Sequence, residues 1–228
     1  MSQYAKAEIK VIDDQLLLKG VSGKGRLMEN ITADTSVVEL ATVADTLQLP
    51  FQNIGKIDNL VGFDKLIKLC LDNNMIEKIQ GIGHLKHLRW LDLSFNKIRK
   101  IEGLSELKAL EDLSLYSNKI TDVEGLELCP KLQCLSLGNN RIDSLEEAIK
   151  LRQLRALKMV NLTGNPICNE PEYKTTVLAY VSNIMYLDYA LVSPEQFSAA
   201  REQFHDELLD VEEKESVAEE KEARGELL

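Results

Sequence analysis

Apolar and polar positions recur every 22 residues through the middle of the chain. Each unit reads L-x-x-L-x-L-x-x-N-x-I-x-x-I-x-x-L-x-x-L, and residues 88–98 (LRWLDLSFNKI) show its first half clearly. Because side chains alternate between the two faces of a β-strand, the leucines of L-x-L point inward and the residues between them point outward. The pattern therefore predicts a stack of short parallel strands, each followed by a turn and a return segment.

A polar residue follows each predicted strand, where the backbone turns away from it. This position recurs at steps of 22 residues and a last step of 25, and it holds Gln52, Asn74, Asn96, Asn118, Asn140 and Asn165. Asparagine can both donate to and accept from loop peptide groups that would otherwise be buried without partners. We expect these residues to form a structural ladder. Glutamine at the first position marks an atypical terminal repeat, and the longer last step predicts an extended convex segment around Glu146 to Arg155.

The unit resembles the leucine-rich-repeat consensus of a strand plus a short helical turn. This resemblance implies an α/β fold, namely a leucine-rich-repeat solenoid with a curved parallel sheet on its concave face and short helices or turns on its convex face. Six units exceed the minimum of about three that a stable stack needs. The stretch from Asn96 to Leu104 (N-x-I-x-x-I-x-G-L) looks like the 22-residue class typified by a phosphatase-regulatory subunit.

Both ends of such a stack must be covered, because a bare terminal repeat would expose its core. Two apolar stretches compatible with helices, Val11 to Leu18 and Val37 to Leu47, suit the start. After the last asparagine, the pattern predicts a helix and a short closing strand. We expect four parts: residues 1–43 as a helical N-terminal segment and cap, 44–165 as six repeats, 166–192 as a C-terminal cap, and 193–228 as an acidic helix.

The last part carries most of the net charge. Residues 195–228 hold twelve acidic and four basic residues, so eight of the ten net negative charges of the chain lie there. Pro194 after Ser193 is typical of a helix start. Apolar residues then follow at intervals of seven, at Phe197, Phe204, Val211 and Ala218. The spacing favours the beginning of a coiled coil, while the polar companion positions and the charge leave a solvated helix or a partly disordered tail as alternatives.

Composition argues against several classes of function. The repeat body is nearly neutral, without the basic footprint that direct nucleic-acid binding requires. No apolar run approaches the length of a membrane span, and the amino terminus does not read as a signal peptide, so we expect a cytoplasmic protein without a membrane partner. The four cysteines form no C-x-x-C pair and the three histidines are poorly placed as ligands, so we assign no metal or cofactor. No catalytic motif appears, and we expect no enzyme activity and no catalytic residues.

The outward strand positions form the predicted binding surface. Large aromatic side chains beside small polar groups are typical anchors of an interface, and aspartates nearby suit a basic partner helix. The candidate partner-binding residues on the concave face are Trp90, Tyr116, Phe95, Phe51, Asp92, Asp112, Asp72 and Met159. For Phe51 and Phe95, packing against neighbouring repeats is an alternative that the sequence leaves open.

Five sequence segments, most of them longer than the repeat consensus alone requires, indicate a more specific family. They are residues 60–78 (LVGFDKLIKLCLDNNMIEK), 90–98 (WLDLSFNKI), 110–118 (LEDLSLYSN), 135–143 (LSLGNNRID) and 185–189 (MYLDY). Together they resemble the leucine-rich-repeat subunit, subunit 3, of the nexin-dynein regulatory complex in motile cilia. The likeness covers roughly Leu47 to Phe204.

That resemblance implies a non-enzymatic scaffold of the ciliary or flagellar axoneme, part of the cytoskeleton, that helps to regulate dynein and motility. Its partners would be other subunits of the complex, through coiled-coil or helical segments, with dynein or tubulin as further partners. Members of that family continue into long coiled coils, so this chain would be a truncated product or a short relative. A phosphatase-regulatory-type adaptor, a spliceosomal leucine-rich-repeat adaptor and a dynein light chain share the repeat pattern and stay open as alternatives.

Overall fold

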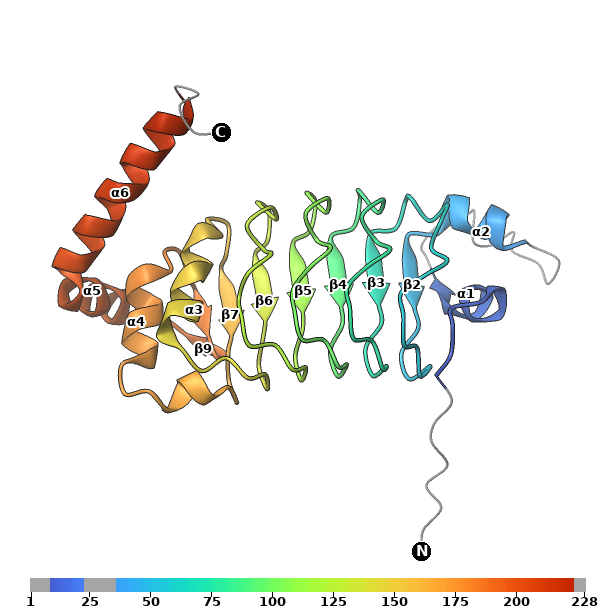
Figure 1. Ribbon diagram of the computed structural model, residues 1–228, viewed down its shortest axis with the longest axis horizontal. Helices are drawn as coiled ribbons and strands as arrows, with labels where there is room; N and C mark the ends of the chain where they lie inside the picture. Colours follow the sequence, from blue (N-terminus) through green and yellow to red (C-terminus); the bar gives the residue numbers. More distant parts are fainter. Residues whose placement is uncertain (1–8, 23–35, 224–228) are drawn as a thin grey trace, which may run out of the picture.

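A computed structural model describes residues 9–22 and 36–223, in which nine strands form one sheet in chain order (Figure 1). Strands β2 to β8 pair in parallel, while β1 (Val21–Ser22) and β9 (Ala190–Leu191) pair antiparallel at the two ends. The repeat strands are β2 (Thr46–Gln48), β3 (Lys68–Cys70), β4 (Trp90–Asp92), β5 (Asp112–Ser114), β6 (Cys134–Ser136) and β7 (Met159–Asn161). The predicted solenoid of six parallel repeat strands is confirmed.

The register of the sheet follows the sequence period. Leu69 pairs with Leu91 and Leu91 with Leu113 across β3, β4 and β5, and all three side chains are fully buried. Their outward neighbours on the same strands are partly or largely exposed. Because each short strand cannot bury its apolar face alone, stacking the repeats creates one continuous core.

The ladder asparagines connect each repeat to the one before it. Asn96 Oδ1 accepts from the Ile76 N–H, and its Nδ2 donates to the carbonyls of Leu71, Leu93 and Ser94 at 3.0–3.1 Å. Asn74, Asn118, Asn140 and Asn165 are likewise buried and make equivalent bonds. Gln52 differs, because its half-buried side chain donates to the Pro50 carbonyl of its own repeat.

The convex side consists mostly of turns. Gly103 and Gly125 adopt left-handed φ values of 72° and 86°, and a Cβ at either would collide with a carbonyl oxygen of the preceding repeat. The segment before the sixth repeat strand instead forms α3 (Leu145–Ile149) and the 3-10 helix η2 (Lys150–Gln153). The three additional residues thus give the longer convex segment that the sequence predicts.

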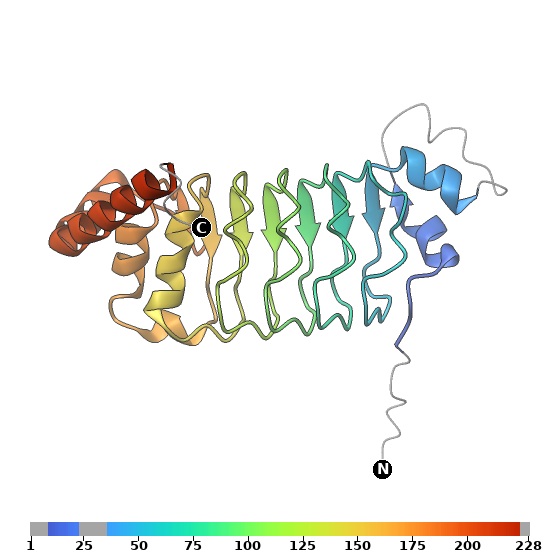
Figure 2. The same cartoon turned by 45° about the horizontal axis from the view of Figure 1, so that its top comes forward.

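At the N-terminal end, two helices and a strand cover the first repeat (Figure 2). The first helix, α1 (Asp14–Gly20), begins three residues later than the apolar stretch from Val11, because the Asp13 side chain caps it. The second, α2 (Val37–Val43), ends before Leu47, which the apolar pattern had included. That extension is wrong, since Leu47 lies in β2 and is fully buried in the sheet core.

At the other end, the last repeat is closed by η3 (Pro166–Asn169), α4 (Tyr173–Tyr180) and β8 (Tyr186–Leu187). The expected helix and closing strand are therefore present, and a hairpin to β9 follows. Asp188 in that hairpin accepts from the Leu162 N–H at 2.8 Å and from the Tyr173 hydroxyl at 2.9 Å. These bonds tie the hairpin and α4 to the sixth repeat.

The acidic part contains two helices rather than the single helix that its spacing predicts. They are α5 (Pro194–Gln203) and α6 (His205–Ala223), and α6 leaves α5 at a steep angle (Figure 1). The chain bends at Phe204, whose ring packs on Tyr180 with centroids 5.8 Å apart, and Ala200 and Leu208 are also buried. A straight helix would carry Leu208 away from the body, so burial of these apolar side chains favours the bend. The seven-residue row through Phe197, Phe204 and Val211 therefore does not form one straight seam.

Candidate protein-binding surface

The concave face is the set of outward side chains on β2 to β7 together with the residues that follow each strand. One row on this face runs through the paired positions Thr46, Lys68, Trp90, Asp112, Cys134 and Met159. A second row runs through Gln48, Cys70, Asp92, Ser114, Ser136 and Asn161. Strands lie about 4.8 Å apart, so each row is a line of adjacent side chains.

Trp90 marks one edge of the concave face. Its side chain is 43 % exposed, and the Lys68 ammonium lies 4.3 Å from the ring centroid. Beside it is a shallow hollow of about 370 Å³, lined in part by Ile67 and by an ion pair between Arg89 and Glu111 at 2.7 Å. The cation fixes one face of the indole and leaves much of the ring to solvent. Such a ring offers apolar area that a partner could cover.

Phe95 and Tyr116 form a second aromatic cluster at the opposite edge. Their rings meet edge to face with centroids 5.5 Å apart, and Asn139 Nδ2 donates to the tyrosine hydroxyl at 2.7 Å. The tyrosine ring lies over the next repeat, where Gly138 has no Cβ to obstruct it. The hydroxyl and the glycine thus hold the tyrosine in place, and Phe95 remains 49 % exposed beside it.

The aromatic residues at this edge occupy an unusual backbone conformation. The residue before each ladder position is left-handed, with φ between 52° and 57° at Phe51, Asn73, Phe95, Ser117 and Asn139. Asparagine tolerates this region well, whereas a bulky aromatic residue does not. Phe51 is 72 % exposed, so burial does not offset its conformational cost. Exposed phenylalanines in a strained conformation point to a role other than packing.

Three carboxylates cross the concave face diagonally. Asp112 lies on β5 and Asp92 on β4, whereas Asp72 lies two residues beyond the end of β3. Each is therefore displaced by two residues along the chain relative to the aspartate of the neighbouring repeat. Burial and the negative charge of Asp92 raise the pKa of the Asp112 carboxyl. Asp92 in turn accepts from the N–H and hydroxyl of Ser94, at 2.9 and 2.6 Å. A cationic side chain placed along this diagonal would relieve the repulsion between the carboxylates.

The eight candidate residues fall into separate groups. Trp90 lies in line with Asp112 and near Asp92, whereas Phe95 and Tyr116 form the opposite edge. Phe51 lies two repeats before Phe95, and Met159, 38 % exposed, lies three strands beyond Trp90. The eight candidates did not include Lys68, Gly138 and Ile67, which also contribute to these groups. The 22-residue register places Lys68 beside Trp90 and Gly138 beside Tyr116, but only the structure shows that they contact these rings.

The cysteines of the described residues are free and lie in different environments. Cys129 is buried, and Cys70 and Cys134 are half-buried on the concave face. Burial raises the pKa of the Cys70 thiol to about 11, so this thiol stays protonated at neutral pH.

Within residues 9–22 and 36–223, no group of three or more metal-ligating side chains comes together. Among the helices of the same residues, none has the length and apolar character that a bilayer crossing requires.

The repeat geometry and its exposed concave face define a class of binding scaffold, and comparison with known proteins gives the family. A leucine-rich-repeat family model matches residues 79–216, so the chain belongs to the leucine-rich-repeat family. Such domains generally serve as non-enzymatic scaffolds for protein–protein interaction. A search of curated proteins found no significant match.

Solved structures with the same fold include an internalin from Listeria monocytogenes. It is 21 % identical with a TM-score of 0.59, and the match covers 76 % of this chain and 55 % of the internalin, so the chain spans about half the length of that protein. A chain of the Drosophila melanogaster SNF/U2A′ complex is also 21 % identical, with a TM-score of 0.54. That match covers 89 % of this chain and 98 % of the other. Identities this low establish the fold alone.

Proposed function

We propose that this protein is a non-enzymatic scaffold whose concave face holds a segment of another protein. The observation that carries the proposal is the pair of exposed aromatic sites, Trp90 at one edge and Phe95 with Tyr116 at the other. Tryptophan and tyrosine are among the residue types enriched in the hot spots of protein interfaces. Their separation across the sheet leaves room for a segment to lie between them.

The diagonal of aspartates selects the chemistry of that segment. A helix with basic residues on the side that faces the sheet would place them near Asp72, Asp92 and Asp112 while its apolar residues cover the two aromatic edges. Charge complementarity of this kind contributes mainly to specificity and to the rate of association. The proposed partner is therefore an amphipathic basic helix or a coiled-coil segment.

Affinity measurements with single variants test the concave face. We expect Trp90→Ala and Tyr116→Ala each to weaken partner binding by about 2 kcal/mol, as truncation of an interface anchor does. Val61→Ala is the matched control, since Val61 is 87 % exposed and lies outside the concave face. Unchanged affinity in folded Trp90 and Tyr116 variants would refute the proposal.

We further propose that the scaffold works in the nexin-dynein regulatory complex of ciliary and flagellar axonemes, where it would help to regulate dynein. The support is the set of sequence runs at residues 60–78, 90–98, 110–118, 135–143 and 185–189, which resemble the leucine-rich-repeat subunit of that complex. Coiled-coil or helical segments of other subunits would then be the partners, with dynein or tubulin as additional contacts.

Localisation distinguishes this proposal from its main alternative. A fluorescently tagged chain in a ciliated cell should label the length of the axoneme and should copurify with other subunits of the complex. The alternative is a spliceosomal leucine-rich-repeat adaptor, suggested by the match that covers 98 % of a chain in the SNF/U2A′ complex. An exclusively nuclear signal would contradict the axonemal proposal and favour this alternative.

A further inference from the structure

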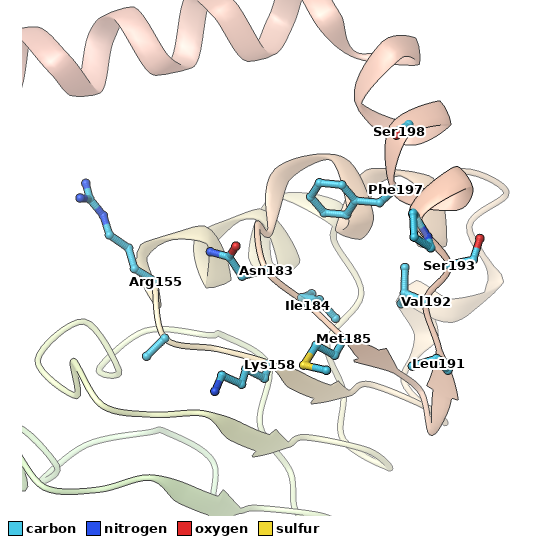
Figure 3. A pocket seen from close by; sticks show the side chains of 12 residues that line it. Arg155, Lys158, Asn183, Ile184, Met185, Leu191, Val192, Ser193, Phe197 and Ser198 are labelled. Carbon is cyan, nitrogen blue, oxygen red and sulfur yellow. The ribbon is translucent and has the colours of Figure 1, made fainter.

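A second surface lies outside the concave sheet, where the last strands meet α5. The groove there has a volume of about 710 Å³. Its walls come from the segments before β7 and β8, from β9 and from the first turns of α5 (Figure 3). The central apolar residues are Met185, Leu191, Val192 and Phe197. We call this surface the terminal groove.

The terminal groove exposes an apolar side chain at the position just before a strand, which in the other repeats mostly holds a polar residue. Backbone hydrogen bonds align Met185 with a row of residues one position before each strand: Asp45, Ile67, Arg89, Glu111, Gln133 and Lys158. All of these except Ile67 are polar or charged, whereas Met185 is 51 % exposed and Leu191, on the edge strand, is 66 % exposed. A contiguous exposed apolar patch of this kind is typical of an interaction site.

Local structure holds the groove open. Val192 N–H donates to the Met185 carbonyl at 2.9 Å and closes the β8–β9 hairpin. Ser193 then caps α5 through a capping box with Gln196, so the chain turns at this point and the Phe197 ring faces the hairpin across the groove (Figure 3). Because the helix is capped and the hairpin is paired, the groove is preorganised in the free protein.

The charged residues at the rim of the groove favour a ligand of opposite charge. The charged residues that line the groove are Arg155 and Lys158, and both are cations on the side opposite Phe197 (Figure 3). The ion pairs formed among the described residues do not include Lys158. The Ser193 hydroxyl, which also lines the groove, already accepts from the Gln196 N–H at 3.2 Å as the cap of α5. The surroundings suit a peptide that presents bulky apolar residues next to carboxylates.

We propose that the terminal groove binds an acidic amphipathic segment of a partner protein. Two bulky apolar side chains, spaced three or four residues apart on a helix, would pack between Met185, Val192 and Phe197, and flanking Asp or Glu residues would face Lys158 and Arg155. The charge preference is opposite to that of the concave face, which favours a basic segment. The scaffold would therefore join two partners of different charge.

An unbiased selection tests this preference. The full chain is used to select binders from a random peptide library displayed on phage, and the enriched peptides are synthesised with a fluorophore for anisotropy measurements. We expect a class of peptides that combines Asp or Glu with Leu, Met or Phe at helical spacing. Failure to recover such a class, or a class without acidic residues, would overturn the proposal.

Paired variants assign the binding to the groove. Leu191→Glu and Lys158→Glu should each weaken the selected peptide by about tenfold or more, as loss of an anchor or reversal of a rim charge does. The matched controls Val61→Glu and Lys131→Glu make the same changes at exposed residues elsewhere and should leave affinity unchanged. Circular dichroism confirms that each variant folds.

The same measurements separate this proposal from the function of the concave face. Trp90→Ala should leave binding of the acidic peptide intact, and loss of binding in that variant would place the peptide on the concave face and overturn the terminal groove as its site. A second copy of the chain is the other occupant to consider. If light scattering shows a dimer that Leu191→Glu dissociates, the groove is a self-association surface and the proposal is wrong.

Discussion

Phe95 reaches the ring of Tyr116 from a left-handed backbone, with φ at 55° and the ring centroids 5.5 Å apart. The same position holds Asn73 one repeat earlier and Asn139 two repeats later, with nearly the same φ. Asparagine avoids most of the steric cost of about 1–2 kcal/mol that other L-residues have in this region. Phenylalanine therefore occupies a position at which asparagine, the residue found in two nearby repeats, would be less strained.

Phe95→Asn separates the contribution of this ring to stability from its contribution to binding. The relief of backbone strain and the loss of an aromatic contact worth about 0.5–1.5 kcal/mol oppose each other, so we expect the free energy of unfolding to change by less than about 1 kcal/mol. Partner affinity should fall about tenfold or more. Denaturant unfolding and calorimetric titration measure the two quantities. A large loss of stability with unchanged affinity would mean that Phe95 serves packing alone.

Asn96→Ala should destabilise the chain by about 2–4 kcal/mol, because it leaves buried backbone groups of two repeats without partners. Gln52→Ala is the control from the first repeat, where the side chain makes one bond to the Pro50 carbonyl and is half-buried. Its effect should stay below about 1 kcal/mol. Equal effects of the two substitutions in urea unfolding would show that the ladder bonds contribute little.

Gly103→Ala should be strongly destabilising, by about 2–4 kcal/mol, because it combines a left-handed φ with a collision against the Ile79 carbonyl. Gly83→Ala, in a convex turn of the neighbouring repeat, is the matched substitution. A Cβ there would lie 3.7 Å from the Glu106 side chain, an ordinary contact, and its φ is not left-handed. Thermal unfolding compares the two, and we expect little change for Gly83→Ala.

Asp112→Asn should stabilise the folded chain at neutral pH. The raised pKa of Asp112 means that the folded state holds this proton more tightly than the unfolded chain. The wild type therefore loses stability as pH rises from the ordinary aspartate pKa through the raised value, and the loss persists above it. Asparagine cannot ionise, so the gain should be below about 1 kcal/mol at pH 7 and absent near pH 3.

Asp112→Asn should have the opposite effect on partner binding from its effect on stability. If Asp112 contacts a basic partner, Asp112→Asn should weaken the complex while it stabilises the free chain. Asp64→Asn, at an exposed convex position, is the control for the loss of one negative charge. Urea unfolding from pH 3 to 8 and titration with the partner measure both effects. A destabilised Asp112→Asn chain at pH 7 would contradict the assigned cause of the pKa shift.

The repeat body could be predicted because its signal is repeated and local. Leu91 and Leu93 alternate with Trp90 and Asp92 in a way that only a strand satisfies, and five further units repeat the pattern. The strand register, the inward leucines and the outward position of Trp90 all follow from that alternation. The candidate surface could be listed for the same reason, although its role in binding stays a prediction.

The ends of the chain depended on contacts that no period encodes. The sequence by itself determined the solenoid, the register of its strands and the side chains available on the concave face, because each of these repeats with the 22-residue unit. Only the tertiary structure decided that β1 and β9 close the sheet, that the chain bends at Phe204 to pack on Tyr180, and that Met185 and Phe197 line one groove. Each of these features joins residues of different elements, and burial of their apolar surface, rather than local spacing, fixes where they meet.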